Sequence, residues 1–462
     1  MRILLVVYDN DSYIHTFPHA LAAIGAILLK HGHEVEVYNQ AMNHYPESHL
    51  QEYLDKNKFD LVGLSFIAGY YEYRKALKIS QAINDSKYRP FFVIGGHGPS
   101  PEPGYFLKKT SADAVVIGEG EETIIELIQA FENKSSLHKV KGIAFSDNGK
   151  FIVNERRPLI KDIDQLPFPA YKLFSMEYYR LNRAPYCSNK EFSIGMLSGR
   201  GCPFKCNFCY RMDEGFRPRS NQSIIEEIKF LRKDYLINHI TFNDELFMSS
   251  CQRTISLCED FIKHNLGIKW ECNGRLNFAK QEVLGLMKKA GCVFINYGIE
   301  SIDDSILKNM NKALTIKQIN TGVGSTIQAG ITPGLNIIFG NIGENKNTLR
   351  KGVDFLLKYA DGIFMRTIRP VTPYPGSELY YYAIKKGLLK DVADFYENKH
   401  INSDLLAVNF TELSDAQFYD ALHEANSELI ESFFKKKQDS YLAQLKKLYY
   451  QKDASFRGFR QT

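Results

Sequence analysis

Long apolar runs are missing from this sequence of 462 residues. The longest, about Ala20–Leu29, is roughly half of the ~20 residues that a membrane-spanning helix needs. Asp9 and Asp11 interrupt the first apolar stretch too early for a signal peptide. No block of like charges occurs either, and the formal net charge is only +5, so charge does not indicate a nucleic-acid partner. We therefore expect a soluble cytoplasmic protein that associates with neither membranes nor nucleic acids.

Cysteines are scarce in the first part of the chain. None of the eight precedes Cys187, and three fall between Cys202 and Cys209. In a chain that is expected to meet a reducing cytoplasm, such clustering indicates a metal site rather than disulfides. The others show no second tight spacing, and Cys251 and Cys258, one heptad apart, are expected to pack in a helix. The five cysteines outside the cluster are Cys187, Cys251, Cys258, Cys272 and Cys292.

The first part of the sequence alternates between apolar segments typical of strands and amphipathic segments typical of helices. The expected strands are RILLVVY, HEVEVY, DLVGLSF, FFVIGG and DAVVIG, and the expected helices lie near 20–31, 47–55, 71–83 and 121–131. Five such units in about 130 residues predict a doubly wound parallel sheet of the Rossmann-like type, which binds ligands at the carboxyl ends of its strands. KGIAFSDNGKFIVNE then predicts a hairpin, and RPLIKDIDQLPFPAY, with three prolines, predicts a linker.

A second alternation begins near Phe192. Its expected strands are FSIGMLS, HITFN, IKWECN, CVFINYGIE, TPGLNIIFG and GIFMRTIRP, with helices between them. Six such units predict a partial (β/α)6 TIM-like barrel with its chemistry at the carboxyl ends of the strands. After TPYPGSELY the pattern is helical, and 415–447 is expected to form one long amphipathic helix. The fold class is therefore α/β, with expected regions 1–150 (Rossmann-like domain), 151–190 (linker), 191–385 (barrel) and 386–462 (helical).

One motif has the ligand spacing of a metal cluster. In SGRGCPFKCNFCY three thiols fall within eight residues, and thiolates are the ligands that iron–sulfur clusters require. Gly201 and Pro203 favour an irregular loop that can wrap one cubane, leaving one of its four irons open. A zinc loop and free thiols are the alternatives, but zinc needs a fourth Cys or His close by and none follows. The candidate ligands, in C-x3-C-x2-C spacing, are Cys202, Cys206 and Cys209.

With Phe208 before the third cysteine, this motif resembles the radical S-adenosylmethionine (SAM) superfamily. The resemblance implies that the three cysteines hold a catalytic [4Fe–4S] cluster. It further implies that the open iron binds the methionine end of SAM, and that the reduced cluster cleaves SAM to a 5′-deoxyadenosyl radical.

Three later motifs, NDELF, NGRLN and GIES, follow in the order of that family. Taken alone, their carboxylates are also compatible with solvated loops or helix caps, and Arg275 with a surface ion pair. One departure is visible, because relatives often carry G-x-P-G-E-T where this chain reads GNIGEN without the proline. The residues that the resemblance implies for SAM binding are Phe208, Asp244, Glu245, Arg275, Glu300 and Ser301.

The N-terminal segments HALAAIGAILLKHGHEVEVY, DLVGLSF, VIGGHGPSPEP and VVIGEGEETIIELI, with the linker DIDQLPFPAY, resemble cobalamin (B12)-binding domains fused to radical SAM barrels. The D-x-H-x-x-G motif, whose histidine binds cobalt in some B12 proteins, is absent, so cobalamin would bind without it. Taken alone, the same residues are compatible with ordinary tight turns, a loop histidine and a helix N-terminus. The residues implied for cobalamin binding are Ser65, Gly95, Gly96, His97, Gly118, Glu119, Gly120 and Glu121.

The two resemblances together imply a cobalamin-dependent methyltransferase that acts on an unactivated carbon or phosphorus centre of a small molecule or natural-product intermediate. One SAM would supply the methyl group through cobalamin, and a second would supply the radical that abstracts hydrogen. A reductant such as flavodoxin or ferredoxin is the implied electron donor. Two alternatives stay open: an oxidative cyclase, rearrangement enzyme or transferase of another SAM fragment, and a SAM- or B12-binding regulatory module. A methylthiotransferase is excluded because it needs an N-terminal cysteine trio.

Overall fold

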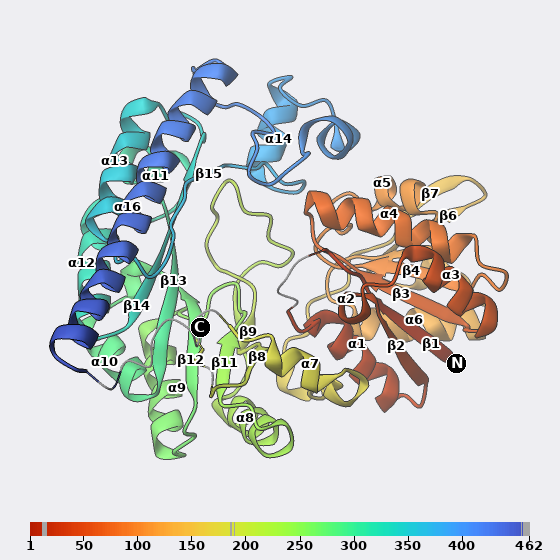
Figure 1. The fold of residues 1–462 in the computed structure, drawn as a ribbon. Coiled ribbons are helices and arrows are strands. Elements are labelled where there is room, and N and C mark those ends of the chain that lie inside the picture. Colours follow the sequence, from red (N-terminus) through yellow and green to blue (C-terminus); the bar gives the residue numbers. More distant parts are fainter. Residues whose placement is uncertain (12–15, 185–186, 189, 454, 456–462) are drawn as a thin grey trace.

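The computed structural model describes residues 1–11, 16–184, 187–188, 190–453 and 455, and it contains two large sheets. Figure 1 shows the N-terminal sheet and its helices on one side of the molecule and the second sheet on the other. The yellow-green segment near residues 200–215 lies between them. This arrangement brings the cysteine loop to the junction of the two sheets.

The N-terminal sheet has the strand order β2-β1-β3-β4-β5-β6-β7. The strands from β2 to β5 pair in parallel, and this order places a topological switch point between β1 and β3. The expected hairpin is confirmed as β6 and β7, which extend the sheet antiparallel beyond β5. The strands are β1 (Arg2–Val7), β2 (Glu34–Asn39), β3 (Leu61–Ser65), β4 (Phe91–Gly95), β5 (Ala114–Val116), β6 (Ile143–Asp147) and β7 (Lys150–Val153).

Helices cover both faces of this sheet, because successive residues of a strand point to opposite sides. In β1, Ile3 and Leu5 belong to the core shared with α1 and α6, whereas Leu4 and Val6 belong to the core shared with α3, α4 and α5. The first helix ends before Gly32, which takes a φ of +81°. The helices are α1 (His19–Lys30), α2 (Gln40–Asn43), α3 (Glu47–Lys56), α4 (Tyr70–Asn84), α5 (Pro103–Thr110) and α6 (Glu121–Glu132).

The linker runs from the first sheet to the second through short helical turns. Its chain packs on α1, where the Ala170 amide donates to the carbonyl of Ala22 (2.9 Å). Tyr171 is buried and donates its hydroxyl hydrogen to the Glu227 carboxylate of the second half (2.6 Å). The short elements of the linker are η2 (Ile163–Gln165), η3 (Tyr171–Leu173) and α7 (Met176–Leu181), and a further turn, η1 (Leu137–Lys139), lies between α6 and β6.

The second sheet is parallel throughout, with the order β15-β14-β13-β12-β11-β8, which confirms a partial barrel. The strand expected in GIFMRTIRP is reduced to two residues, because Asp361 accepts the amide hydrogens of Ile363 and Phe364 and so forms a turn there. The strands are β8 (Ser193–Met196), β11 (His239–Phe242), β12 (Lys269–Gly274), β13 (Cys292–Glu300), β14 (Thr332–Phe339) and β15 (Arg369–Pro370), with a separate pair β9 (Gly199–Arg200) and β10 (Arg217–Pro218).

Helices follow the strands of the second sheet in turn. Several begin with a side-chain cap, such as Asn345, whose carboxamide oxygen accepts the amide hydrogens of the first turn of α13. The elements between the strands are α8 (Asn221–Tyr235), α9 (Cys251–Lys263), η4 (Leu276–Phe278), α10 (Gln281–Lys289), α11 (Asp304–Asn309), α12 (Ile316–Gln328) and α13 (Lys346–Lys358).

The C-terminal region is helical, as the sequence predicts. Its long helix packs along α13 in its first half, where Phe418 stacks on Phe339 with ring centroids 4.8 Å apart. Beyond Phe433 its side chains are mostly exposed. The elements are α14 (Glu378–Lys385), α15 (Val392–Asp394), the π-helical turn η5 (Phe395–Lys399) and α16 (Asp415–Tyr450).

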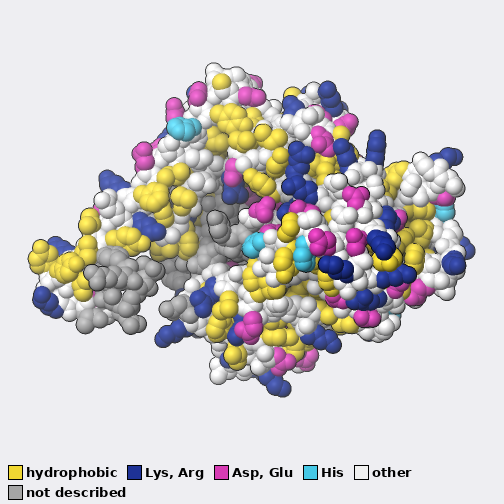
Figure 2. All heavy atoms as spheres, turned by 45° about the vertical axis from the view of Figure 1, so that its right-hand side comes forward, with side chains coloured by type: hydrophobic (Ala, Val, Ile, Leu, Met, Phe, Trp, Pro, Cys, Tyr) yellow, Lys and Arg dark blue, Asp and Glu magenta, His cyan; other side chains and the backbone are white. Residues whose placement is uncertain are grey.

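The surface agrees with the mixed charge of the sequence. Figure 2 shows acidic and basic side chains interspersed over one face of the molecule, without a continuous basic surface on that face. Among the described residues, no helix combines the length and the apolar character that crossing a bilayer requires.

Candidate active site

The cysteine motif forms an irregular loop between β9 and β10, beyond the carboxyl end of β8. Gly201 has a φ of +85°, and a Cβ there would lie 2.4 Å from the carbonyl oxygen of Gly215. The loop therefore requires glycine at this position, as the sequence predicts. Within the loop, the amide of Cys209 donates to the carbonyl of Cys206 (3.2 Å), which turns the chain so that the two thiols lie together.

Of the three thiols of the loop, only Cys206 has a lowered pKa, whereas burial raises the pKa of Cys202. The pKa of Cys206 is lowered mainly by its hydrogen bond with the Cys209 thiol, against burial, and further by the charges of Lys312 and Arg275. The same pairing raises the pKa of Cys209, because both thiols cannot ionise together. Two buried cations beside three cysteines fit an anionic iron–sulfur cluster, which needs thiolates as ligands.

A cavity of about 360 Å³ lies against the cysteine loop. Its walls are the carboxyl ends of β12, β13 and β14 and the segment after β11, as expected for a barrel-type active site. The predicted SAM residues that line it are Phe208, Glu245, Arg275 and Glu300, together with the three cysteines.

The two other predicted SAM residues do not line this cavity. Asp244 is fully buried and turns away from it, because its carboxylate accepts the amide hydrogen (3.0 Å) and the hydroxyl hydrogen (2.9 Å) of Ser198. Ser301 is also buried, and its hydroxyl has no hydrogen-bond partner among the described residues. Of the neighbours Asp244 and Glu245, only Glu245 faces the cavity, and burial raises the pKa of its carboxyl.

Lys312 is a site residue that the sequence reasoning missed. Its ammonium lies 2.9 Å from the Glu300 carboxylate, and both side chains are nearly buried. Glu300 itself has a φ of +69°, where the pairing of β13 with β14 shifts register after Gly298. Such a conformation costs energy in a non-glycine residue and is found mostly at functional sites. With this backbone conformation, the Glu300 carboxylate and the Lys312 ammonium line the same cavity as the three cysteines.

Arg275 is held in place from two sides. Its guanidinium lies 3.5 Å from the ring centroid of Phe204 in the cysteine loop. It also donates to the carbonyl oxygens of Lys312 and Ala313, the latter at 3.3 Å. The Arg275 side chain is therefore fixed beside the cysteine loop.

A row of three asparagines forms another part of the cavity wall, and the sequence reasoning also missed it. Asn336 donates to the Asn296 carboxamide (2.7 Å), and Asn296 donates to that of Asn273 (3.1 Å). Asn273 and Asn296 are directly paired on β12 and β13, and Asn336 on β14 is paired with Gly298, two residues further along. No motif signals such a row, because its members meet only when the parallel strands pair.

A second cavity, of about 390 Å³, lies under the carboxyl ends of the N-terminal strands. Apolar and small residues of β1, β3, β4, β5 and α1 line it, among them Leu5, Gly63, Val93, Val116 and Ala20. On its other side it is closed by residues of the second half, such as Leu197 and Gly199. The predicted cobalamin residues that line it are Ser65, Gly95, Gly96, Gly118, Glu119, Gly120 and Glu121.

The backbone around this cavity fits a large ligand that approaches closely. Gly118 has a φ of +81°, and a Cβ there would meet nothing within 4 Å. Gly96 has a φ of +98°, and a Cβ there would lie 2.6 Å from the hydroxyl oxygen of Ser65. An apolar slot at the switch point of a doubly wound sheet suits the nucleotide tail of cobalamin.

His97 lies elsewhere than the other predicted cobalamin residues. It lines the cavity at the cysteine loop and packs edge-on against Tyr210, with ring centroids 4.6 Å apart. Gly376, in the segment TPYPGSELY, lies against the same Tyr210 ring, because a Cβ there would come within 2.4 Å of it. His97 thus connects the N-terminal sheet to the residue that follows Cys209.

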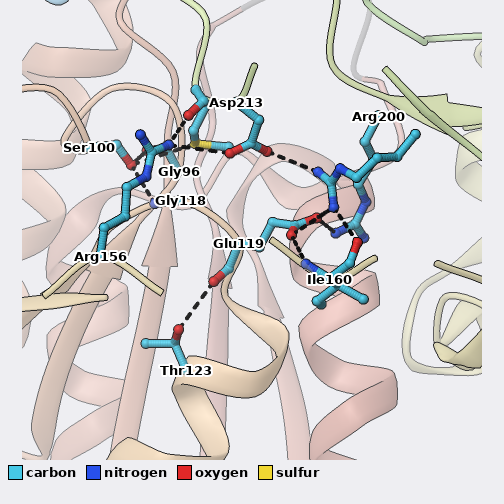
Figure 3. A network of polar contacts seen from close by, with 11 residues as sticks. Gly96, Ser100, Gly118, Glu119, Thr123, Arg156, Ile160, Arg200 and Asp213 are labelled. Atoms are coloured by element: carbon cyan, nitrogen blue, oxygen red, sulfur yellow. Dashed lines mark hydrogen bonds and ion pairs between the residues drawn. The ribbon is translucent and has the colours of Figure 1, made fainter. Parts of the chain in front are cut away.

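Glu119 and Glu121 form ion pairs with the second half of the chain, and Figure 3 shows the Glu119 part of this network. The Glu119 carboxylate accepts hydrogen bonds from Arg200 (2.6 Å), Arg217 (2.9 Å) and the amide of Ile160 (2.8 Å). Glu121 pairs with the other terminal nitrogen of Arg200 at 2.5 Å. These carboxylates therefore join the two halves at the wall of the second cavity.

The two cavities adjoin at Glu245, which lines both. His97 in the first follows Gly96 in the second, so the loop after β4 borders both spaces. The structure therefore places a site for a thiolate-bound cluster next to a site for a flat, extended ligand. Of the predicted SAM residues, Phe208, Arg275 and Glu300 line the cavity on the cluster side, and Glu245 lies at the junction itself.

Comparison with known proteins agrees with this arrangement. The B12 binding domain matches residues 6–128, and the Radical SAM superfamily matches residues 196–356. An uncharacterized methyltransferase from Pyrococcus horikoshii is 30% identical over 399 residues, which cover 84% of each chain. The anaerobic magnesium-protoporphyrin IX monomethyl ester cyclase from Rubrivivax gelatinosus is 28% identical over 396 residues, or 82% of this chain and 69% of the cyclase. The solved structure of the radical SAM methyltransferase TsrM from Kitasatospora setae, with cobalamin and a [4Fe–4S] cluster bound, is similar with a TM-score of 0.75 at 17% identity, covering 93% of this chain and 89% of TsrM.

Proposed function

Because this chain belongs to the radical SAM enzymes that carry a B12-binding domain, we propose that it is a cobalamin-dependent methyltransferase acting on an unactivated carbon or phosphorus centre of a small molecule. Family membership confirms the cofactors that the sequence predicts, which are a [4Fe–4S] cluster, SAM and cobalamin. When bound, the cluster supplies the electron that cleaves SAM, and cobalamin supplies a carrier for the methyl group.

The observation that carries the proposal is the meeting of the two cavities at Glu245. A methyl group carried by one cofactor must reach a substrate from which the other has removed a hydrogen atom. Both cofactors must therefore face the same enclosed space, which also protects a radical from water. A protein that only sensed SAM or cobalamin would have no need for adjoining cavities.

The residues around the cluster have separate tasks. Cys202, Cys206 and Cys209 hold three irons, which leaves the fourth for the polar end of SAM. Arg275 offers a guanidinium to the SAM carboxylate, and Glu245 offers a carboxylate to its amino group. These opposite charges orient SAM before it is cleaved, so that the reaction starts from one geometry.

The substrate is a small molecule, and its polar groups would meet the asparagine row of Asn273, Asn296 and Asn336. Carboxamides both donate and accept hydrogen bonds, so the row can orient a substrate without charge. A flavodoxin or ferredoxin is the proposed electron donor.

Anaerobic turnover of the reconstituted holoenzyme tests this function. With SAM, cobalamin and a chemical reductant, we expect two products by mass spectrometry: 5′-deoxyadenosine from reductive cleavage and S-adenosylhomocysteine from methyl donation. Omitting cobalamin should abolish S-adenosylhomocysteine and leave 5′-deoxyadenosine. The variant Cys202→Ala/Cys206→Ala/Cys209→Ala should bind no cluster iron and form no 5′-deoxyadenosine.

The cyclase relative supports a second candidate, an oxidative cyclisation. The products distinguish the two functions, because a cyclase would form 5′-deoxyadenosine and no S-adenosylhomocysteine. That pattern in the presence of cobalamin would refute the methyltransferase proposal. A binding module without catalysis would form neither product.

A further inference from the structure

A separate group of Cys, His and Glu side chains, of the types that bind metals, lies at the opposite end of the barrel strands from the cysteine loop. Cys187 and Glu191 precede β8, and His239 is the first residue of β11. One ligand atom from each of the three lies within 4.8 Å of the other two. The active site is at the carboxyl ends of these strands, so this group is not part of it.

His239 is the unusual member of this group. Its side chain is completely buried, yet neither ring nitrogen has a hydrogen-bond partner among the described residues. The nearest carboxylate oxygens lie 3.6 Å away, at Glu191, and 3.9 Å away, at Glu271. A buried imidazole whose nearest acceptors lie beyond hydrogen-bond distance is costly, because it loses its hydrogen bonds with water without fully replacing them. Something that binds the ring would remove this cost.

The distances around His239 match a metal ion better than direct hydrogen bonds. Tetrahedral zinc holds its ligands at about 2.0–2.3 Å, which separates neighbouring ligand atoms by about 3.3–3.8 Å. The 3.6 Å between Nδ1 of His239 and Oε2 of Glu191 is close to the roughly 3.3–3.5 Å that a nitrogen and an oxygen ligand require. A thiolate, an imidazole and a carboxylate are together the donor set of zinc. We propose that Cys187, Glu191 and His239 bind a structural zinc ion, with water as the fourth ligand.

The surrounding residues support this ligand set. Glu271 has one oxygen that accepts from the hydroxyl of Thr241 (2.9 Å). Its other oxygen is buried, accepts no hydrogen bond from the described residues, and lies 3.9 Å from Nε2 of His239. A carboxylate behind a metal-binding histidine accepts its second ring hydrogen and so fixes the tautomer that binds metal. Lys269 pairs with the other oxygen of Glu191 at 2.5 Å, and Oε2, which accepts the amide hydrogen of Ser188 (2.8 Å), keeps a second lone pair for the ion.

A zinc ion at this site would connect the end of the linker to the amino-terminal ends of the barrel strands. Cys187 and Glu191 belong to the segment that enters β8, and His239 belongs to the neighbouring strand β11, paired with β8 from its first residue. Because β8 leads to the cysteine loop at its other end, the ion would hold the strand that supports the cluster. Binding of a metal to the folded chain stabilises it by mass action.

Zinc content, measured by mass spectrometry on the full-length chain, tests the proposal. The variant Cys202→Ala/Cys206→Ala/Cys209→Ala serves as the background, because it removes the thiols of the cluster loop that could bind zinc adventitiously. We expect about one zinc per chain in this background. Adding Cys187→Ser should reduce the zinc severalfold, whereas the matched control Cys251→Ser, another half-buried cysteine outside the cluster, should leave it unchanged.

Cobalt replacement and X-ray absorption test the ligands of the metal directly, without a further variant. Co²⁺ added to the metal-free background should show a thiolate-to-cobalt charge-transfer band, and zinc absorption spectra should show one sulfur among nitrogen and oxygen neighbours. Absence of zinc and of this band from the background would overturn the proposal and leave His239 as a cation between Glu191 and Glu271. Zinc that persists at full amount in the Cys187→Ser variant would overturn it equally.

Discussion

Replacing Glu119 by glutamine tests whether the ion pairs at the cavity wall hold the two halves of the protein together. The Glu119 carboxylate is only 6% exposed and accepts from Arg200, Arg217 and the amide of Ile160. Glutamine keeps the shape of the side chain and one acceptor oxygen. Its NH2 group, which is a donor, takes the place of the second carboxylate oxygen, which accepted hydrogen bonds. The change therefore removes the charge and leaves the packing.

The expected cost follows from the bonds that are lost. A hydrogen bond to a charged group contributes about 1.5–3 kcal/mol net, and glutamine forfeits about two of them. The full penalty for an unpaired buried charge does not apply, because Arg200 keeps Glu121 and Arg217 keeps Asp213. We expect Glu119→Gln to lower the free energy of unfolding by about 3 kcal/mol, and to weaken cobalamin binding because the carboxylate lines its cavity.

Urea denaturation of the apoprotein measures this cost, and cobalamin retention on gel filtration measures the second effect. Glu155→Gln is the matched control, because the Glu155 side chain is 72% exposed and forms an ion pair with Lys141 at 2.9 Å. A surface pair of this kind contributes at most about 1 kcal/mol. The reasoning is refuted if Glu119→Gln and Glu155→Gln unfold at the same urea concentration with equal slopes.

Three further changes test other parts of the site. Lys312→Met removes the buried ammonium beside Glu300, so the cluster should become harder to reduce. An electrochemical titration followed by electron paramagnetic resonance should show a more negative reduction potential. An unchanged potential would contradict the role given to this charge. Burial raises the pKa of Glu344 to about 8. Between the ordinary pKa of a glutamate and pH 8, the folded state therefore binds one more proton than the unfolded state. The free energy of unfolding then falls as pH rises, by up to ~1.4 kcal/mol per pH unit. Glu344→Gln should flatten this fall in urea denaturation from pH 5.5 to 8, and an equal slope in both proteins would count against it. Gly63→Leu fills the floor of the second cavity and should abolish cobalamin uptake while the cluster absorbance remains, whereas full uptake would place cobalamin elsewhere.

The sequence predicted the features that depend on neighbours along the chain. Three thiols within eight residues form one site whatever the rest of the fold does, provided that Gly201 allows the loop. The alternation of apolar segments predicted both sheets, because a strand or helix that buries one face must carry apolar residues at the period of that element. Even so, the strand expected in GIFMRTIRP shrank to Arg369–Pro370, since local turn chemistry at Asp361 overrode its apolar character.

Only the tertiary structure decided which side chains meet at long range. Asp244 and Glu245 are adjacent in sequence, and the path of the backbone after β11 turns one inward and the other into the cavity. Glu119 and Arg200 are 81 residues apart, and the docking of two sheets makes them an ion pair. In the sequence Cys187 shows no metal-site spacing. His239, 52 residues later, comes close to it only when β11 pairs with β8. Parallel strands bring their ends together from distant parts of the chain, and no local pattern records which ends become neighbours.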